Sequence, residues 1–245
     1  MSARQRIDQQ PSFVLHTYPY RETSLIVEVF SRDHGRIGLV AKGARRPMSQ
    51  LRGVLMAFQP LFIDWSGGGE MKTLVRAEWQ GGQPLLGGQA LLCAYYLNEL
   101  LLRLLPRQDA HPALYQAYAD ALHALAHGES QEVVLRRFEL ALLQELGYGL
   151  ALDKDCDGVP IRPDADYAYI IERGAVPLDD HGVDDPGVVR GKTLIDMAHH
   201  DLQDPDTLAQ SKALMRRLIQ HYLGGQVLQS RRVFTELLAP PGDFS

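Results

Sequence analysis

The chain has 245 residues, of which 45% are hydrophobic and 22% charged, and this composition indicates a globular protein that can bury a core without disulfides. Its two cysteines, Cys93 and Cys156, cannot form a disulfide framework or a four-cysteine metal site. No segment approaches about eighteen uninterrupted apolar residues, and residues 1–12 lack the apolar core of a secretion signal. We therefore expect a cytoplasmic protein without a membrane span.

The net charge of −5 is unevenly distributed along the chain. Residues 1–80 contain eleven Lys and Arg against seven Asp and Glu, whereas residues 81–245 contain fourteen against twenty-three. A basic first part and an acidic second part favour two domains with different partners. We predict domains over residues 1–80 and 81–245, with a linker where Gly and Pro cluster at residues 81–88.

Short β-branched or aromatic segments, separated by turn residues, predict five strands in the first domain. They cover residues 13–16, 24–30, 36–41, 61–65 and 71–79. Strands that follow one another without helices between them indicate a small barrel rather than a sheet built with crossover helices. An OB-fold is the barrel type that we expect.

The third of these strands leads into a cationic loop. Lys42, Arg45, Arg46 and Arg52 lie within eleven residues that contain no Asp or Glu. Gly43 lets the backbone turn, and Pro47 prevents a helical continuation. Such a loop suits a polyanion, although a solvated loop on an ordinary strand connection is the alternative interpretation.

The second domain changes to helical periodicity. Helices are predicted over residues 89–105, 112–127 and 130–146, and again over 192–200, from 206 to 223 and over 230–238. Residues 150–185 are acidic and rich in loops, with one strand-like run at Tyr167–Ile171. The predicted fold class is therefore α+β: an N-terminal five-stranded OB-fold barrel followed by an all-helical C-terminal domain with a loop-rich insertion.

Several short motifs, in this order and spacing, resemble the RecO family of bacterial recombination mediators over most of the chain. Each motif alone is weak, but together they are specific. The residues that carry the resemblance are Phe13–His16, Glu22–Leu25, Val40–Arg45, Gly69–Leu74 with Glu78, Tyr96–Leu101, Leu135–Glu139 and Leu146–Gly149.

The resemblance implies a DNA repair mediator without catalytic residues or cofactors. Family members bind single- and double-stranded DNA, anneal complementary strands, bind the tail of single-stranded-DNA-binding protein (SSB), and work with RecR to load RecA recombinase. A basic loop on a small barrel independently favours nucleic-acid binding. Our candidate DNA-binding residues are Arg36, Lys42, Arg45, Arg46, Arg52, Lys72 and Arg76.

The implied SSB tail is an acidic peptide that ends in an apolar residue and a free carboxylate. It needs an apolar cleft with a cation at its edge. Arg136 lies one helical turn before Leu140 and two before Leu143, so we predict that these three residues bind the tail. The alternative is that Arg136 pairs with Glu132 or Glu139 on a solvated helix face.

Metal binding is not expected. Many relatives carry a four-cysteine zinc module where residues 150–185 of this chain contain Cys156 alone, and zinc requires about four ligands. Residues 153–164 imitate a calcium loop in their spacing of aspartates and Gly158. Pro160 and an aspartate rather than a glutamate at the last position argue against that interpretation.

Two alternatives from other classes remain open: an OB-fold nucleic-acid chaperone in RNA metabolism, and a metal-dependent nuclease that uses the acidic segment. The nuclease lacks sequence support because His199, His200 and Asp201 form no recognised catalytic motif. Among barrel aromatics, Tyr20, Phe58 and Trp65 are candidates for base stacking, unless they belong to the core.

Overall fold

The computed structural model describes residues 6–178 and 187–238. The chain divides into two compact units, Met1–Gly128 with Leu228–Ser245 and Glu129–Val227, which we call the barrel unit and the α4 unit. Within the described ranges, no helix combines the length and apolar character needed to cross a membrane. The last seven residues of the acidic segment, 179–185, lie outside the described ranges.

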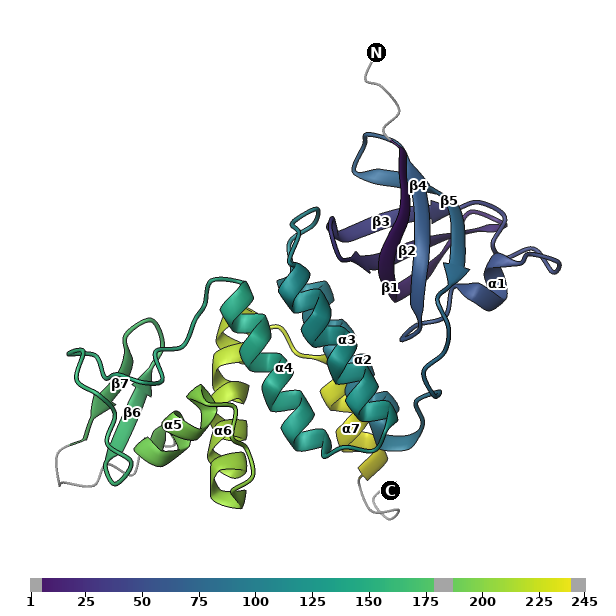
Figure 1. Cartoon of the computed structure of the whole chain (residues 1–245). Helices are drawn as coiled ribbons and strands as arrows, with labels where there is room; N and C mark the ends of the chain where they lie inside the picture. Colours follow the sequence, from purple (N-terminus) through teal and green to yellow (C-terminus); the bar gives the residue numbers. More distant parts are fainter. Residues whose placement is uncertain (1–5, 179–186, 239–245) are drawn as a thin grey trace. The chain divides into compact units, whose positions relative to one another are not determined.

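The barrel unit begins with a closed five-stranded barrel in the order β1-β2-β3-β5-β4 (Figure 1). Its strands are β1 (Arg6–Tyr20), β2 (Ser24–Ser31), β3 (Gly35–Ala41), β4 (Pro60–Ser66) and β5 (Met71–Trp79). Neighbouring strands pair antiparallel except β3 and β5, which pair in parallel and close the barrel. The prediction of an N-terminal five-stranded OB-fold is therefore confirmed.

Alternating apolar residues fill the inside of the barrel. Val27 and Val29 on β2, Ile37 on β3 and Ile63 on β4 are all buried, and they pack into one cluster. β-branched residues suit this position because they pack well on a pleated surface. Trp65 completes the cluster with an exposure of only 1%.

Helices continue the same compact unit beyond the barrel. They are the short α1 (Leu51–Val54), then α2 (Gly88–Leu104), α3 (Pro112–Ala126) and α7 (Gln229–Leu238). The rings of Phe13 and Phe30 contact Tyr115 and Tyr118 of α3 at centroid distances of 5.1–6.1 Å. Because this aromatic layer joins barrel and helices, the unit extends to Gly128, whereas strand-type sequence ends near residue 80.

Helix α7 returns to the barrel unit from the end of the chain. The carboxylate of Glu99 on α2 accepts hydrogen bonds from the main-chain N–H groups of Gln229 and Ser230, both at 2.9 Å. An acid at this position satisfies N–H groups that a helix N-terminus otherwise leaves unpaired. Glu99 thereby fixes the start of α7.

The α4 unit contains helices α4 (Gln131–Glu145), α5 (Gly191–Ala198) and α6 (Pro205–Tyr222) with a three-stranded antiparallel sheet in the order β7-β6-β8. The strands are β6 (Asp166–Ile170), β7 (Gly174–Pro177) and β8 (Val188–Arg190). Strand β6 matches the predicted run at Tyr167–Ile171. Strands β7 and β8 have only four and three residues, which is too short to show a pattern, so the segment is more regular than its sequence predicted.

Candidate nucleic-acid interface

Main-chain hydrogen bonds shape the cationic loop between β3 and α1. Gly43 has a φ of +71°, a conformation that favours glycine. The N–H of Arg46 donates to the Gly43 carbonyl oxygen at 3.1 Å, and the N–H of Arg45 donates to that of Thr23 at 2.9 Å. The second bond ties the loop to the turn after β1, and Ala44 anchors it by burying its methyl group. The loop therefore has a defined path.

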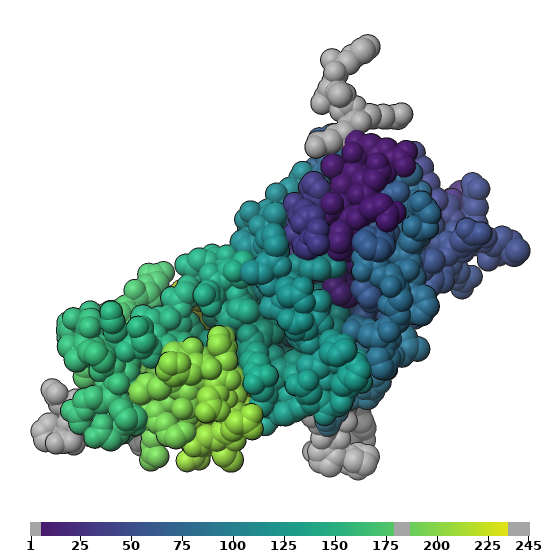
Figure 2. Space-filling view, in the orientation of Figure 1, coloured from purple at the N-terminus to yellow at the C-terminus, as the bar shows by residue number. Residues whose placement is uncertain are grey.

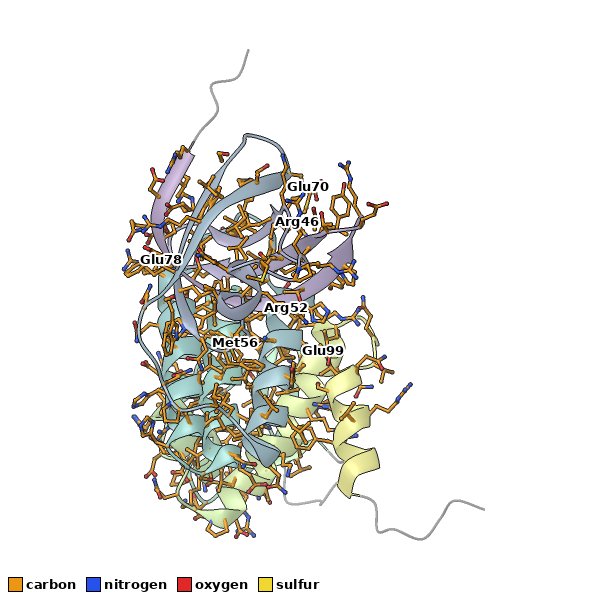
Figure 3. The ribbon with its side chains drawn as sticks, turned by 90° about the vertical axis from the view of Figure 1, so that its right-hand side faces the viewer. Arg46, Arg52, Met56, Glu70, Glu78 and Glu99 are labelled. Carbon is orange, nitrogen blue, oxygen red and sulfur yellow. The ribbon has the colours of Figure 1, made fainter. Side chains whose placement is uncertain are left out.

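The cationic side chains of this loop point to solvent. Lys42, Arg45, Arg46 and Arg52 are all exposed, and none of them forms an ion pair with any residue that the structure describes. The loop stands out from the side of the barrel (Figure 2), with Arg46 and Arg52 labelled in Figure 3. Four cations without neutralising acids form a positive surface that attracts phosphates. The structure thus brings these four predicted residues together.

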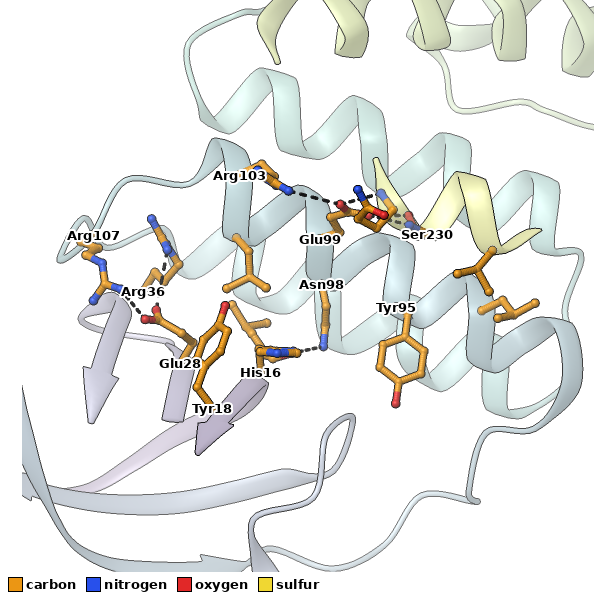
Figure 4. Close-up of a pocket in the computed structure, with 15 residues that line it drawn as sticks. His16, Tyr18, Glu28, Arg36, Tyr95, Asn98, Glu99, Arg103, Arg107 and Ser230 are labelled. Atoms are coloured by element: carbon orange, nitrogen blue, oxygen red, sulfur yellow. Dashed lines mark hydrogen bonds and ion pairs between the residues drawn. The ribbon is translucent and has the colours of Figure 1, made fainter. Parts of the chain in front are cut away.

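Arg36, also a predicted DNA-binding residue, lies elsewhere on the barrel unit. It lines a cavity of about 770 Å³ beside α2 (Figure 4). Its guanidinium donates to the Leu105 carbonyl oxygen at 2.9 Å and lies 3.6 Å from the buried carboxylate of Glu28, which Arg107 also contacts. Burial lowers the pKa of Arg36 from its usual value. Arg36 therefore compensates the charge of Glu28 and joins β3 to the end of α2.

The two predicted residues on β5 are also engaged. The Lys72 ammonium donates to the side-chain oxygen of Gln108 at 2.9 Å and to the Gly69 carbonyl oxygen at 3.3 Å. Arg76 is exposed but pairs with Glu78 on the same strand. Lys72 keeps its charge but is held by hydrogen bonds, and Glu78 offsets the charge of Arg76. The loop from Lys42 to Arg52 is therefore the stronger candidate for phosphate binding.

The predicted tail-binding residues lie on α4. Arg136 is only 7% exposed, and its guanidinium contacts the Glu139 carboxylate at 2.5 Å and the Lys212 carbonyl oxygen at 3.5 Å. Leu140 and Leu143 are buried in the core of the α4 unit. Arg137, in contrast, is exposed. Arg136 thus pairs with Glu139, as in the alternative interpretation of the sequence. The pair is buried, however, and does not lie on a solvated helix face.

The aromatic residues of the barrel unit separate clearly into core and surface. Phe58 and Trp65 are buried, so they belong to the core rather than to a stacking surface, and Tyr20 lies under the guanidinium of Arg21. Trp79, which the sequence analysis did not single out, is 60% exposed. In the sequence, only its position just before Gly81 and Gly82, where the predicted strand ends, indicated that Trp79 could be exposed.

The acidic loop of the α4 unit is held by hydrogen bonds between its own residues. The carboxylate of Asp155 accepts from the N–H groups of Asp157 and Val159, both at 2.9 Å, and Asp164 pairs with Arg162. No group of three or more His, Cys, Asp or Glu side chains is arranged to hold a metal ion within the described ranges. The expectation that the protein needs no metal stays a prediction.

A closed barrel of this strand order is an OB-fold, a class of protein that binds oligonucleotides or oligosaccharides, and a cationic loop on its side is a feature expected of the nucleic-acid-binding members. Two family models match the chain: "Recombination protein O N terminal" over residues 6–82 and "Recombination protein O C terminal" over residues 87–232. The chain therefore belongs to the RecO family of DNA repair proteins.

Curated relatives agree with this assignment. The chain is 68% identical over 240 residues to "DNA repair protein RecO" of Aromatoleum aromaticum, covering 97% of this chain and 99% of the relative. It is 67% identical over 241 residues to the protein of the same name from Azoarcus sp., with the same coverage of 97% and 99%. The corresponding protein of Dechloromonas aromatica is 58% identical over 240 residues, again with 97% and 99% coverage.

Proposed function

We propose that this protein is a non-enzymatic mediator that binds single- and double-stranded DNA, anneals complementary strands, and helps RecR to load RecA onto SSB-coated single strands. The observation that carries the proposal is the set of exposed cations from Lys42 to Arg52 on an OB-fold barrel, none of which forms an ion pair within the described part of the chain. The family membership and the name shared by its relatives support the same role. Such a protein acts in the cytoplasm, at the nucleoid during repair.

The physical basis for annealing is charge neutralisation. Two complementary strands repel each other through their phosphates, and cations that replace the condensed counterions reduce this repulsion. Phosphate contacts carry no sequence information, so the same loop serves any pair of complementary strands. This property suits a repair protein that must act wherever DNA is damaged.

The proposed partners are SSB, RecR and, through them, RecA. We place the SSB tail on α4, where Arg136 and the neighbouring Arg137 supply positive charge. Arg136 must exchange its contact with Glu139 for the tail carboxylate, whereas exposed Arg137 is free to steer an acidic peptide. Arg has a planar group that can bind a carboxylate through two hydrogen bonds.

A strand-annealing assay on SSB-coated complementary oligonucleotides tests the proposal. The protein is expected to accelerate duplex formation on coated strands and to leave the strands intact with Mg²⁺ present. Failure to anneal coated DNA contradicts the mediator role. Cleavage products that require a divalent metal would favour the nuclease alternative, and annealing of RNA but not DNA would favour the RNA chaperone.

A further inference from the structure

An apolar groove of about 540 Å³ lies on the barrel unit between α1, the end of β5 and the segment that follows it. Val54, Met56, Trp79, Pro84 and Leu85 line it, and Met56 is labelled in Figure 3. Trp79 and Leu85 are 60% and 74% exposed. Large apolar side chains gathered at an open groove mark a binding surface. We call this the Trp79 groove.

The indole ring of Trp79 is held in a fixed orientation. Its ring N–H donates to the side-chain oxygen of Gln59 at 3.3 Å. Gly82 lies against the six-membered ring, where an added Cβ would come within 2.7 Å of a ring carbon. Gln83 fixes this segment by donating to the Phe58 carbonyl oxygen at 2.7 Å. The ring is therefore preorganised, and because its only polar group is already engaged, it offers apolar surface to a ligand.

The cationic loop runs directly into this groove. Arg52 belongs to α1, and the next two residues, Gly53 and Val54, line the groove. Lys42, Arg45 and Arg46 precede α1 on the same loop. A row of cations that ends beside an exposed aromatic ring is the combination by which proteins bind single-stranded nucleic acids, with phosphates on the cations and bases stacked on the rings.

We propose that the Trp79 groove is a binding site for unpaired bases: a single-stranded polynucleotide places its phosphates along the loop from Lys42 to Arg52 and stacks a base on Trp79. This inference rests on the proposed DNA-binding function and adds a site for the bases to it. A repeating polyanion fits a run of four cations better than an acidic peptide does, because a peptide presents its charges only where acidic residues occur. The site also distinguishes single strands from duplexes, since bases inside a duplex are already stacked.

Tryptophan fluorescence gives a direct readout, since the chain contains only two tryptophans and Trp65 is buried. Titration with an oligothymidylate is expected to quench the fluorescence of Trp79. An abasic oligomer of the same length, which retains the phosphates, is expected to bind with little quenching. The Trp79→Phe variant identifies the signal, because its remaining fluorescence should not respond to either oligomer.

Affinities measured by anisotropy of a labelled oligonucleotide complete the test. Trp79→Ala is expected to weaken binding of single strands by about 5- to 150-fold, the range for loss of one stacked base. Trp79→Phe should retain most of the affinity. The slope of affinity against salt should not change, because Trp79 neutralises no phosphate. Val75→Ala, at another exposed apolar residue of β5, is the matched control and should bind like the wild type.

The outcomes separate this inference from the function on which it rests. Wild-type affinity in Trp79→Ala, or equal quenching by the abasic oligomer, would overturn the stacking site while DNA binding itself persists. Absence of DNA binding by the wild-type protein would overturn both proposals. Quenching by an acidic peptide, together with unchanged DNA affinity in Trp79→Ala, would assign the groove to a protein partner and overturn the inference.

Discussion

The side-chain amide of Asn98 donates a hydrogen bond to the main-chain carbonyl oxygen of Leu15 at 2.8 Å, which joins helix α2 to strand β1. The amide oxygen of Asn98 accepts a second bond, from the Tyr118 hydroxyl of α3 at 2.5 Å. Burial raises the pKa of Tyr118 well above its usual value, so the hydroxyl keeps its proton and remains a donor. One buried side chain thus connects the barrel to two helices.

We predict that Asn98→Ala destabilises the protein by about 1–3 kcal/mol, the cost of leaving a buried hydrogen-bonding group unpaired. Denaturant-induced unfolding should show a lower midpoint for the variant. Gln116→Ala is the control, since Gln116 is exposed on α3 and its side chain donates to Asp120 on the same helix, and its effect should stay within about 0.5 kcal/mol. Equal midpoints for wild type and Asn98→Ala would contradict the bridging role.

The two cysteines should differ in reactivity. Burial raises the pKa of Cys93 to about 11, and the residue is 2% exposed, so little thiolate is present at pH 8 and access is restricted. Cys156 is partly exposed. We predict one fast and one slow thiol in titration of the native protein with a disulfide reagent, and two fast thiols after denaturation. The slow thiol should react faster as the pH rises toward 11, and Cys93→Ala should remove it.

The barrel was predictable from sequence because its signals are local. The strands are short runs rich in β-branched and aromatic residues, such as Val27, Val29 and Ile63, and turn residues separate them. The cations of the loop were equally visible, since no acid interrupts them. Whether a cation is free to bind a ligand, however, depends on contacts with residues that are distant in the sequence. Arg36 meets Glu28 across two paired strands and Leu105 from the end of α2, and no local pattern reveals either contact.

Helix α4 shows the same limit. Helical spacing predicted that Arg136, Leu140 and Leu143 share one side of the helix, but it could not show that all three are buried. The Lys212 carbonyl oxygen that contacts Arg136 belongs to α6, 76 residues away in sequence. The exposure of Trp79 could not be predicted from the sequence for a similar reason, because it depends on the path of the chain around Gly82.

For the SSB tail, we predict that Arg136→Lys weakens binding and that Arg136→Glu abolishes it, as measured by fluorescence anisotropy with a labelled tail peptide. Lysine cannot reproduce the two parallel hydrogen bonds of a guanidinium to a carboxylate. Because Arg136 is buried against Glu139, Arg136→Glu places two acids together, so circular dichroism must show that the variant is folded.

Arg137→Glu provides a second variant of the same helix at an exposed position. It should also weaken binding of the tail peptide, because an acid at this position repels the acidic residues of the peptide. Its free energy of unfolding should stay within about 0.5 kcal/mol of the wild type. If folded Arg136→Glu and Arg137→Glu variants both bind the peptide with full affinity, the tail binds elsewhere.

The central claim, that the loop from Lys42 to Arg52 contacts DNA phosphates, is tested most directly by the salt dependence of single-stranded DNA affinity in the variant Lys42→Ala/Arg45→Ala/Arg46→Ala. For single-stranded DNA, the loss of one phosphate contact makes the slope of log affinity against log salt concentration shallower by roughly 0.7. A control variant, Arg6→Ala/Arg32→Ala, removes cations that pair with Asp8 and Asp33 and should retain the wild-type slope. We predict weaker binding to all sequences and a slope flatter by about 2 in the loop variant. Unchanged affinity and slope in that variant would contradict the account.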